Sequence, residues 1–159
     1  MVKAVKAAIL FHLAAALPAA ALSFSVSGGW PLTIDGTNLS GTAGSDLVSS
    51  YLSVSNALVI DVTDAVDEFD VWYIDVHQVE VAWDNSLAMS AIRTTDGTGL
   101  GTISGGEALQ EITGTATRFF EGTGNRSAIH IQLALEGVSV TLGGDTYSLQ
   151  IVFTLLDGS

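Results

Sequence analysis

Residues 22–34 read LSFSVSGGWPLTI, and an apolar side chain or a glycine occupies every second position of this stretch. Successive side chains of a β-strand point to opposite faces, so the alternation predicts one long strand, or two collinear strands, with a single apolar face. Pro31 has no N–H to donate to a ladder and predicts an edge position or a bulge, while Gly28-Gly29 predicts a bend. The apolar positions are Leu22, Phe24, Val26, Trp30, Leu32 and Ile34.

The same two-residue period recurs in the rest of the chain, most clearly near its end. Turn regions rich in Gly, Asp and Asn separate the periodic segments, and no helical period appears after residue 21. The pattern therefore predicts an all-β domain, a single antiparallel sandwich of about seven to nine strands. Beyond the first stretch, strands are expected at residues 47–54, 57–62, 71–83, 87–93, 112–120, 129–135, 138–142 and 147–155.

The segment 142–151, LGGDTYSLQI, resembles the turn into the penultimate or last strand of an immunoglobulin-like domain. Such domains contain a tyrosine corner, in which a Tyr near the start of a strand bonds back to upstream backbone. The resemblance implies this role for Tyr147, with Asp145 in the turn. The segment is also similar to the ends of pilin and spore-coat-U-type surface subunits, although the chain has no cysteine for the disulfide common in chaperone–usher pilins.

The chain after residue 21 also resembles secreted β-proteins of uncharacterised function. These carry a Trp-containing strand, an Arg-Thr-x-Asp-Gly loop and a Ser-Gly-Gly turn, here at residues 72–83, 93–97 and 104–106. The resemblances together imply an immunoglobulin-like sandwich and leave the function open.

The first 21 residues have the features of a signal peptide. Lys3 and Lys6 form a basic start, residues 7–17 are apolar apart from one His, and residues 19–21 match the A-x-A cleavage pattern. The apolar run is about half of the roughly 20 residues that a membrane-spanning helix needs. We therefore expect cleavage after residue 21, a mature domain of residues 22–159 without a membrane anchor, and an extracellular or cell-surface location.

The charge of the expected mature chain is strongly negative. Its only strong cations are Arg93, Arg118 and Arg126, and against seventeen acidic residues they leave a net charge of −14. Such a surface repels nucleic-acid phosphates and anionic lipids, so neither is an expected partner. The chain has no cysteine, which excludes disulfides, thiolate metal sites and thiol nucleophiles.

No motif of the sequence predicts a catalytic centre. A serine nucleophile needs a neighbouring base, and the mature chain offers only His77 and His130, without a G-x-S-x-G turn around any serine. Acid–base hydrolysis of sugars needs two carboxyls held across the bond, and no spacing in the sequence indicates such a pair. The chain is therefore not expected to be an enzyme.

The sequence does not require a cofactor, and calcium is the ion that its loops would suit best. Hard cations take oxygen ligands from loops, but the acidic positions do not have EF-hand spacing, and a solvated acidic loop is the simpler interpretation. The candidate ligands are Asp61, Asp64, Asp67, Glu68, Asp70 and Asp96. Asn38 and Asn125 begin N-x-Ser sequons, which matter only in a host that glycosylates.

The apolar stretch at the expected new N-terminus suggests a function. A terminal strand is free to leave its own domain and to complete the sheet of a neighbour, a mode of binding called β-augmentation. The first hypothesis is therefore a structural subunit of an extracellular filament or surface coat, with the chain itself as partner and the apolar positions of residues 22–34 as the donated strand. The alternatives are that this segment is the first strand of its own sandwich, or that the domain is a secreted module for carbohydrate or another surface ligand. In the second of these, Trp30, Trp72 and Trp83 would form a stacking platform, and binding could depend on calcium.

Overall fold

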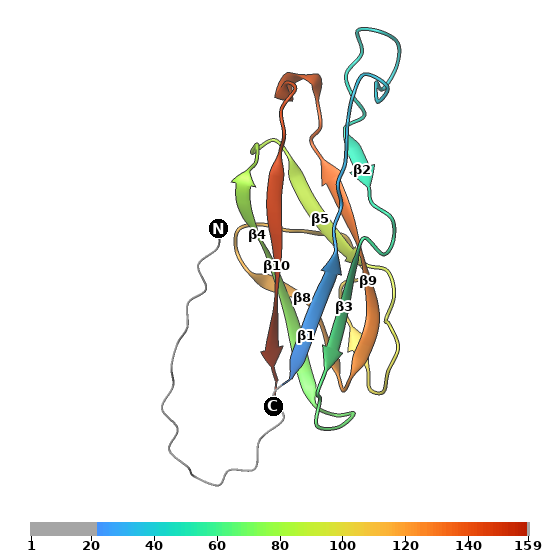
Figure 1. Ribbon diagram of the computed structural model, residues 1–159, viewed down its shortest axis with the longest axis vertical. Helices are drawn as coiled ribbons and strands as arrows, with labels where there is room; N and C mark the ends of the chain where they lie inside the picture. Colours follow the sequence, from blue (N-terminus) through green and yellow to red (C-terminus); the bar gives the residue numbers. More distant parts are fainter. Residues whose placement is uncertain (1–21, 159) are drawn as a thin grey trace.

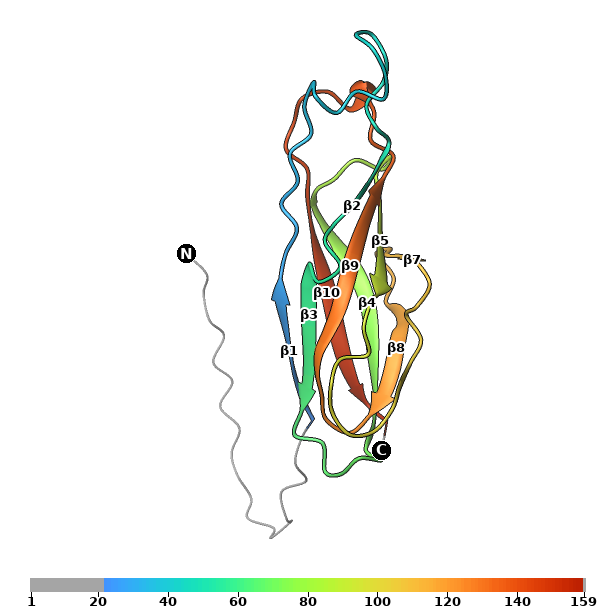
Figure 2. The ribbon, with the colours of Figure 1, turned by 90° about the vertical axis from the view of Figure 1, so that its right-hand side faces the viewer.

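The computed structural model describes residues 22–158, which form two antiparallel β-sheets packed face to face (Figures 1 and 2). This confirms the predicted all-β, antiparallel fold. The predicted signal peptide, residues 1–21, lies outside the described residues.

The larger sheet has six strands. Its order is β1-β3-β9-β5-β7, and β2 pairs with the end of β9 that β3 leaves uncovered. Every pairing is antiparallel. The bounds are β1 Ser23–Gly28, β2 Ser50–Leu52, β3 Leu58–Thr63, β5 Ala88–Arg93, β7 Gln110–Glu111 and β9 Arg126–Glu136.

The smaller sheet has four strands in the order β10-β4-β8-β6. Its longest ladder joins the edge strand β10 to β4 over ten residues, with one bulge at the start of β10. The bounds are β4 Val71–Ala82, β6 Ile103–Ser104, β8 Thr117–Thr123 and β10 Ser148–Asp157, and a short 3-10 helix, η1, covers Val140–Leu142.

Alternating apolar residues from both sheets meet in one core between them. Trp72 is fully buried at its centre, where its ring meets Phe120 edge to face and its indole N–H donates to the Gly124 carbonyl at 2.7 Å. Gly122 leaves room for that ring, since a Cβ there would lie 2.5 Å from it. Burial of each large apolar side chain stabilises the folded state by roughly 1.5–3 kcal/mol relative to an exposed side chain. The largest fully buried side chains are Trp72, Phe120, Ile60, Ile74, Ile112, Ile129, Ile131, Val62 and Val76.

Four predicted strands are shorter or take a different form in the structure, and one of them, 47–54, is reduced to Ser50–Leu52. The N-terminal strand ends at Gly28, and residues 29–34 are not part of a ladder, because Gly28 has a positive φ of 104° and Pro31 cannot donate a hydrogen bond. The predicted strand 138–142 does not form, and Val140–Leu142 are instead a turn of 3-10 helix with Ser139 as its N-cap. In the predicted strand 112–120, only the part from Thr117 onward is a strand.

The two edges of the sandwich differ. At one edge, the segment after β5 crosses from the six-stranded sheet to β6 in the four-stranded sheet and so covers the opening between them. At the other edge, β1 and β10 are the border strands and lie close together, but no ladder of the described chain joins them (Figure 1). This second edge is called the open edge below.

Candidate functional site

A groove of about 910 Å³ opens at the open edge, between residues 26–34 on one side and β10 on the other. We call it the edge groove. It reaches the core of the sandwich, because several of its lining residues are buried core side chains. These are Leu58, Leu87, Met89, Leu133, Leu135, Val138 and Phe153.

One wall of the edge groove is a segment without hydrogen bonds. Gly29 donates its N–H to the Ala57 carbonyl at 3.0 Å, and the next backbone bond is the one that Asp35 donates to Asn38 Oδ1. Between them, residues 30–34, here called the strap, make no hydrogen bond within the described chain. The strap is held by the half-buried side chains of Trp30 and Ile34, which pack against the core.

The other wall is β10. One edge of this strand pairs with β4 from Ser148 to Asp157, and no strand of residues 22–158 pairs with its other edge. Leu149, Ile151 and Phe153 point into the groove. At residues 149–151, which line the groove, the backbone of this edge is therefore available for a further extended segment.

Two loops at one end of the groove are tied together through Asp46. Its carboxylate accepts the Val140 and Leu47 N–H groups at 2.8 Å and the Ser139 hydroxyl at 3.0 Å. These hydrogen bonds, with the Val140 N–H as the largest contribution, hold the pKa of Asp46 below its ordinary value of 3.8. The loop before β2 and the η1 turn are thus joined by a carboxylate that is charged near neutral pH.

A smaller cavity of about 220 Å³ adjoins the edge groove and shares Trp83, Asp145, Thr146 and Tyr147 with it. Two carboxylates, those of Asp84 and Asp145, line this cavity, which we call the acidic end. The Ser86 hydroxyl and N–H donate to Asp84 and hold its pKa below the ordinary value. None of the described residues that line the two cavities is Lys, Arg or His.

The tyrosine at the acidic end makes the contact that its resemblance implies. The Tyr147 hydroxyl donates to the backbone carbonyl of Leu142, five residues upstream. Asp145 lies in the turn and accepts the Thr146 N–H at 2.7 Å. Together with the Trp83 indole N–H, which donates to the Leu87 carbonyl at 3.1 Å, these bonds fix both aromatic rings at the rim.

The residues predicted to form a donated strand lie in their own domain in this structure. β1 pairs with β3 through all six residues, from Ser23↔Thr63 to Gly28↔Leu58. Leu22 and Phe24 are half-buried against the core, whereas Val26 is 40 % exposed. Of the strap side chains, Leu32 is 39 % exposed and lines the groove with Trp30 and Ile34.

The acidic residues considered as calcium ligands do not converge. Within residues 22–158, no group of three or more His, Asp or Glu side chains is arranged to hold a metal ion. Asp61, Asp67 and Asp70 instead accept backbone N–H groups, and Asp96 pairs with the Arg93 guanidinium. Asp64 and Glu68 belong to the same loop, which Gly124 of the β8–β9 turn approaches closely.

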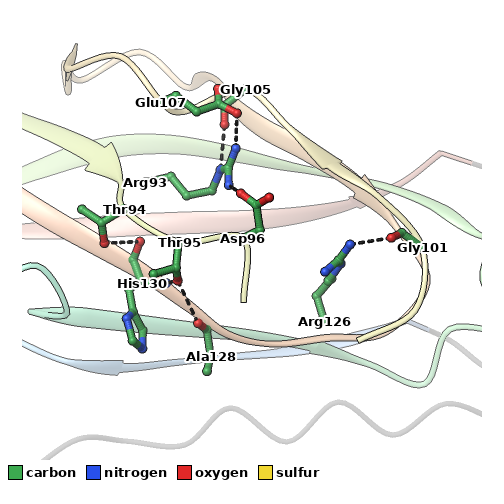
Figure 3. A network of polar contacts seen from close by, with 10 residues as sticks. All are labelled: Arg93, Thr94, Thr95, Asp96, Gly101, Gly105, Glu107, Arg126, Ala128 and His130. Atoms are coloured by element: carbon green, nitrogen blue, oxygen red, sulfur yellow. Dashed lines mark hydrogen bonds and ion pairs between the residues drawn. The ribbon is translucent and has the colours of Figure 1, made fainter. Parts of the chain in front are cut away.

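The covered edge of the sandwich carries a polar network (Figure 3). The Arg93 side chain, 1 % exposed, contacts the carboxylates of Asp96 and Glu107 and donates from Nε to the Gly105 carbonyl at 2.7 Å. Thr94 and Thr95 bond to the backbone of β9, and Arg126 bonds to the Gly101 carbonyl. All of these contacts bind the crossing segment to the sandwich, which gives the network a structural role.

The other residues singled out in the sequence are dispersed. His77 belongs to β4 of the four-stranded sheet and His130 to β9 of the six-stranded sheet. Trp72 is buried in the core, so the three tryptophans do not form one platform. Trp30 and Trp83 line the edge groove.

Sequence reasoning did not identify the acidic end. Asp84 and Asp145 are 61 positions apart and meet only because β4 and β10 are paired. The one local signal was that each acid stands within two residues of an aromatic residue at a strand end, Trp83 and Tyr147.

No helix among residues 22–158 is long and apolar enough to cross a membrane. The chain matches no family model, no curated protein and no solved structure.

Proposed function

We propose that this chain is a structural subunit of an extracellular filament or cell-surface assembly, in which copies join by exchanging the N-terminal strand. One observation carries the proposal. β1 is a border strand with a single ladder partner, and it continues into a strap that has no hydrogen bond. Residues 22–34 are thus attached to their domain by one ladder and a few half-buried side chains.

The composition of this segment supports exchange. Residues 22–34 contain no charged side chain in a chain that otherwise carries seventeen acids. The exchanged segment itself therefore adds no negative side chain to the copy that receives it. The strap would act as the linker, and its five residues span at most about 18 Å when extended.

Exchange between copies preserves the contacts described above. The β1 strand of one copy would pair with β3 of the next in the same register, and Leu22 and Phe24 would fill the same sites. The balance between monomer and polymer then depends on protein concentration and on the linker. A head-to-tail exchange that does not close into a ring produces a filament.

A disulfide between β1 and β3 tests the proposal. Ser23 and Thr63 are directly opposite each other and both exposed, and the natural chain has no cysteine to interfere. Opposed residues of an antiparallel pair have Cα atoms about 4.5–5.5 Å apart, within the range of a disulfide. The oxidised Ser23→Cys, Thr63→Cys variant should remain monomeric, and the reduced variant should assemble, as judged by native mass spectrometry and negative-stain electron microscopy.

A matched variant controls for the disulfide itself. Gln150 and Val79 are opposed in the β10–β4 ladder, so cysteines at these positions would join two strands without holding β1. This variant should assemble in both redox states. Equal assembly of the oxidised and reduced β1–β3 variant would refute strand exchange, as would unchanged assembly after deletion of residues 22–27.

The edge groove favours a second candidate function, a secreted module that binds carbohydrate or another surface ligand. Trp30 and Trp83 line the groove and offer aromatic surface to a ligand. Under this function, Trp30→Ala and Trp83→Ala variants lose ligand affinity, and the protein remains monomeric. The native mass measured for strand exchange also separates these two functions.

A further inference from the structure

We propose that the edge groove and its acidic end bind an extended peptide of another protein, with alternating apolar side chains and a Lys or Arg at one end. The inference rests on the second function proposed above, a binding module, and identifies its ligand class. It is independent of strand exchange.

The size and lining of the groove suit an apolar ligand. Its volume of about 910 Å³ is within the range of roughly 300–1,000 Å³ found for ligand clefts. Leu133, Leu135 and Phe153 of the core belong to its lining, so a ligand that fills it would extend the core outward.

The free edge of β10 selects an extended backbone. An added strand can pair with this edge and turn every second side chain into the groove, where Leu149 and Ile151 already point. The backbone then provides affinity with little dependence on sequence. The groove side chains discriminate in favour of apolar residues.

Charge complementarity selects a cation at one end of the peptide. Asp84 and Asp145 lie beside the Trp83 and Tyr147 rings, and a Lys or Arg side chain can pair with carboxylates and lie against aromatic faces. No cationic residue lines the two cavities, so a fatty-acid carboxylate or a phosphate finds no counter-charge there.

A second copy of the chain matches this site less well. Its residues 23–28 are already paired with β3 of their own domain, and after cleavage the only charge that residues 22–34 would bring is the α-ammonium group of Leu22. The three arginines of the described chain are already bonded within their own domain: Arg93 to two carboxylates, Arg118 to Asp75, and Arg126 to a backbone carbonyl. Residues 22–158 thus offer no lysine and no unbonded arginine to the acidic end, which favours a Lys or Arg of another protein.

The test uses the oxidised Ser23→Cys, Thr63→Cys protein, in which β1 cannot exchange. The probe is the peptide acetyl-Lys-Leu-Thr-Phe-Thr-Val-amide, and the readout is the tryptophan fluorescence of Trp30 and Trp83, since the peptide itself contains no Trp. A saturable change is expected. A peptide with Glu in place of Lys should bind more weakly by a factor of roughly three to ten.

Two protein variants locate the cation. Asp145→Asn keeps the acceptor for the Thr146 N–H but removes the charge, and should weaken binding of the Lys peptide roughly three- to tenfold without affecting the Glu peptide in the same way. Glu111→Gln removes one charge from exposed β7 at the covered edge and should leave binding unchanged. Equal effects of both substitutions would mean that only net charge matters and would overturn the proposed cation site.

Further probes distinguish the occupants. Two versions of the Lys peptide, one N-methylated at the odd residues and one at the even residues, should differ in binding. Only the version that keeps the backbone N–H groups facing β10 should bind. Equal binding of the two methylated peptides would overturn the inference. Tighter binding of palmitate than of the unmodified Lys peptide would overturn it as well. Binding of a glycan without binding of the peptide would also overturn it and leave the binding module intact, whereas no response to any of these probes would refute both.

Discussion

Gly28 and Gly29 are adjacent in the sequence, and the structure gives them different environments. Gly28 has a φ of 104°, and a Cβ at this position would lie 2.2 Å from the Ala57 carbonyl oxygen. Gly29 has no positive φ, and its Cβ position has no atom within 4 Å. The close approach of β1 to the start of β3 therefore depends on the first glycine alone.

Substitution of these two glycines tests how β1 is held. Gly28→Ala should lower the free energy of unfolding by about 1–2 kcal/mol from its left-handed backbone alone, with the contact to Ala57 adding to this. Gly29→Ala should change it by less than about 0.5 kcal/mol. Urea denaturation gives both values, and amide hydrogen exchange of residues 23–28 should accelerate in the first variant only. A similar effect of both substitutions would show that backbone conformation at Gly28 is not what holds the strand.

At the scale of elements, the segment between β5 and β7 closes one edge of the sandwich. Arg93 at the end of β5 is the centre of its attachment, with a buried guanidinium and two carboxylates that are about two-thirds exposed. Because the carboxylates remain hydrated, loss of the arginine does not leave a buried unpaired charge. What is lost is a set of charge-assisted hydrogen bonds to the crossing segment.

Arg93→Lys should therefore destabilise the protein by about 1.5–3 kcal/mol, since a lysine cannot reproduce the planar set of donors. Cleavage by a protease within residues 94–109 should become faster. Arg118→Lys is the matched control, because Arg118 also pairs with a carboxylate, that of Asp75 at 2.7 Å, but its side chain is 43 % exposed. This substitution should lower the free energy of unfolding by no more than about 1 kcal/mol. If urea denaturation gave the same loss of unfolding free energy for both variants, a special role of Arg93 would be contradicted.

For the molecule as a whole, charge is the dominant property. Residues 22–158 contain three arginines and seventeen acidic residues, so neighbouring copies repel one another. The range of this repulsion is about 30 Å in 10 mM salt and about 8 Å in 150 mM salt. Strand exchange must occur against it.

Assembly should therefore increase when NaCl is raised from 10 to 150 mM, and sedimentation velocity measures this directly. The oxidised β1–β3 disulfide variant should remain monomeric at both concentrations, which separates exchange from simple aggregation. CaCl₂ and MgCl₂ at equal ionic strength should act alike, because Asp61, Asp67 and Asp70 accept backbone N–H groups and the acids of residues 22–158 are not grouped as ligands. Assembly that decreases with added salt would point to contacts between opposite charges instead.

Much of the strand pattern could be read from the sequence. The segments 57–62, 71–83, 87–93 and 147–155 differ from β3, β4, β5 and β10 by at most two residues at either end. Alternation is a local property of extended backbone, and β3 and the first half of β4 each bury one face. Residues 138–142 alternate equally well but form no strand, and Val140–Leu142 are a 3-10 turn, because Asp46 from a distant loop binds Ser139 and Val140.

The sequence by itself determined that the chain forms an antiparallel sandwich, because the two-residue period follows from the geometry of each strand. Only the tertiary structure decided which edge is covered and which is open. That outcome depends on pairings between segments far apart in the chain: β1 with β3, and β10 with β4. The edge groove and its acidic end exist only after these ladders have formed, since Asp84 and Asp145 come together through the register of β4 and β10.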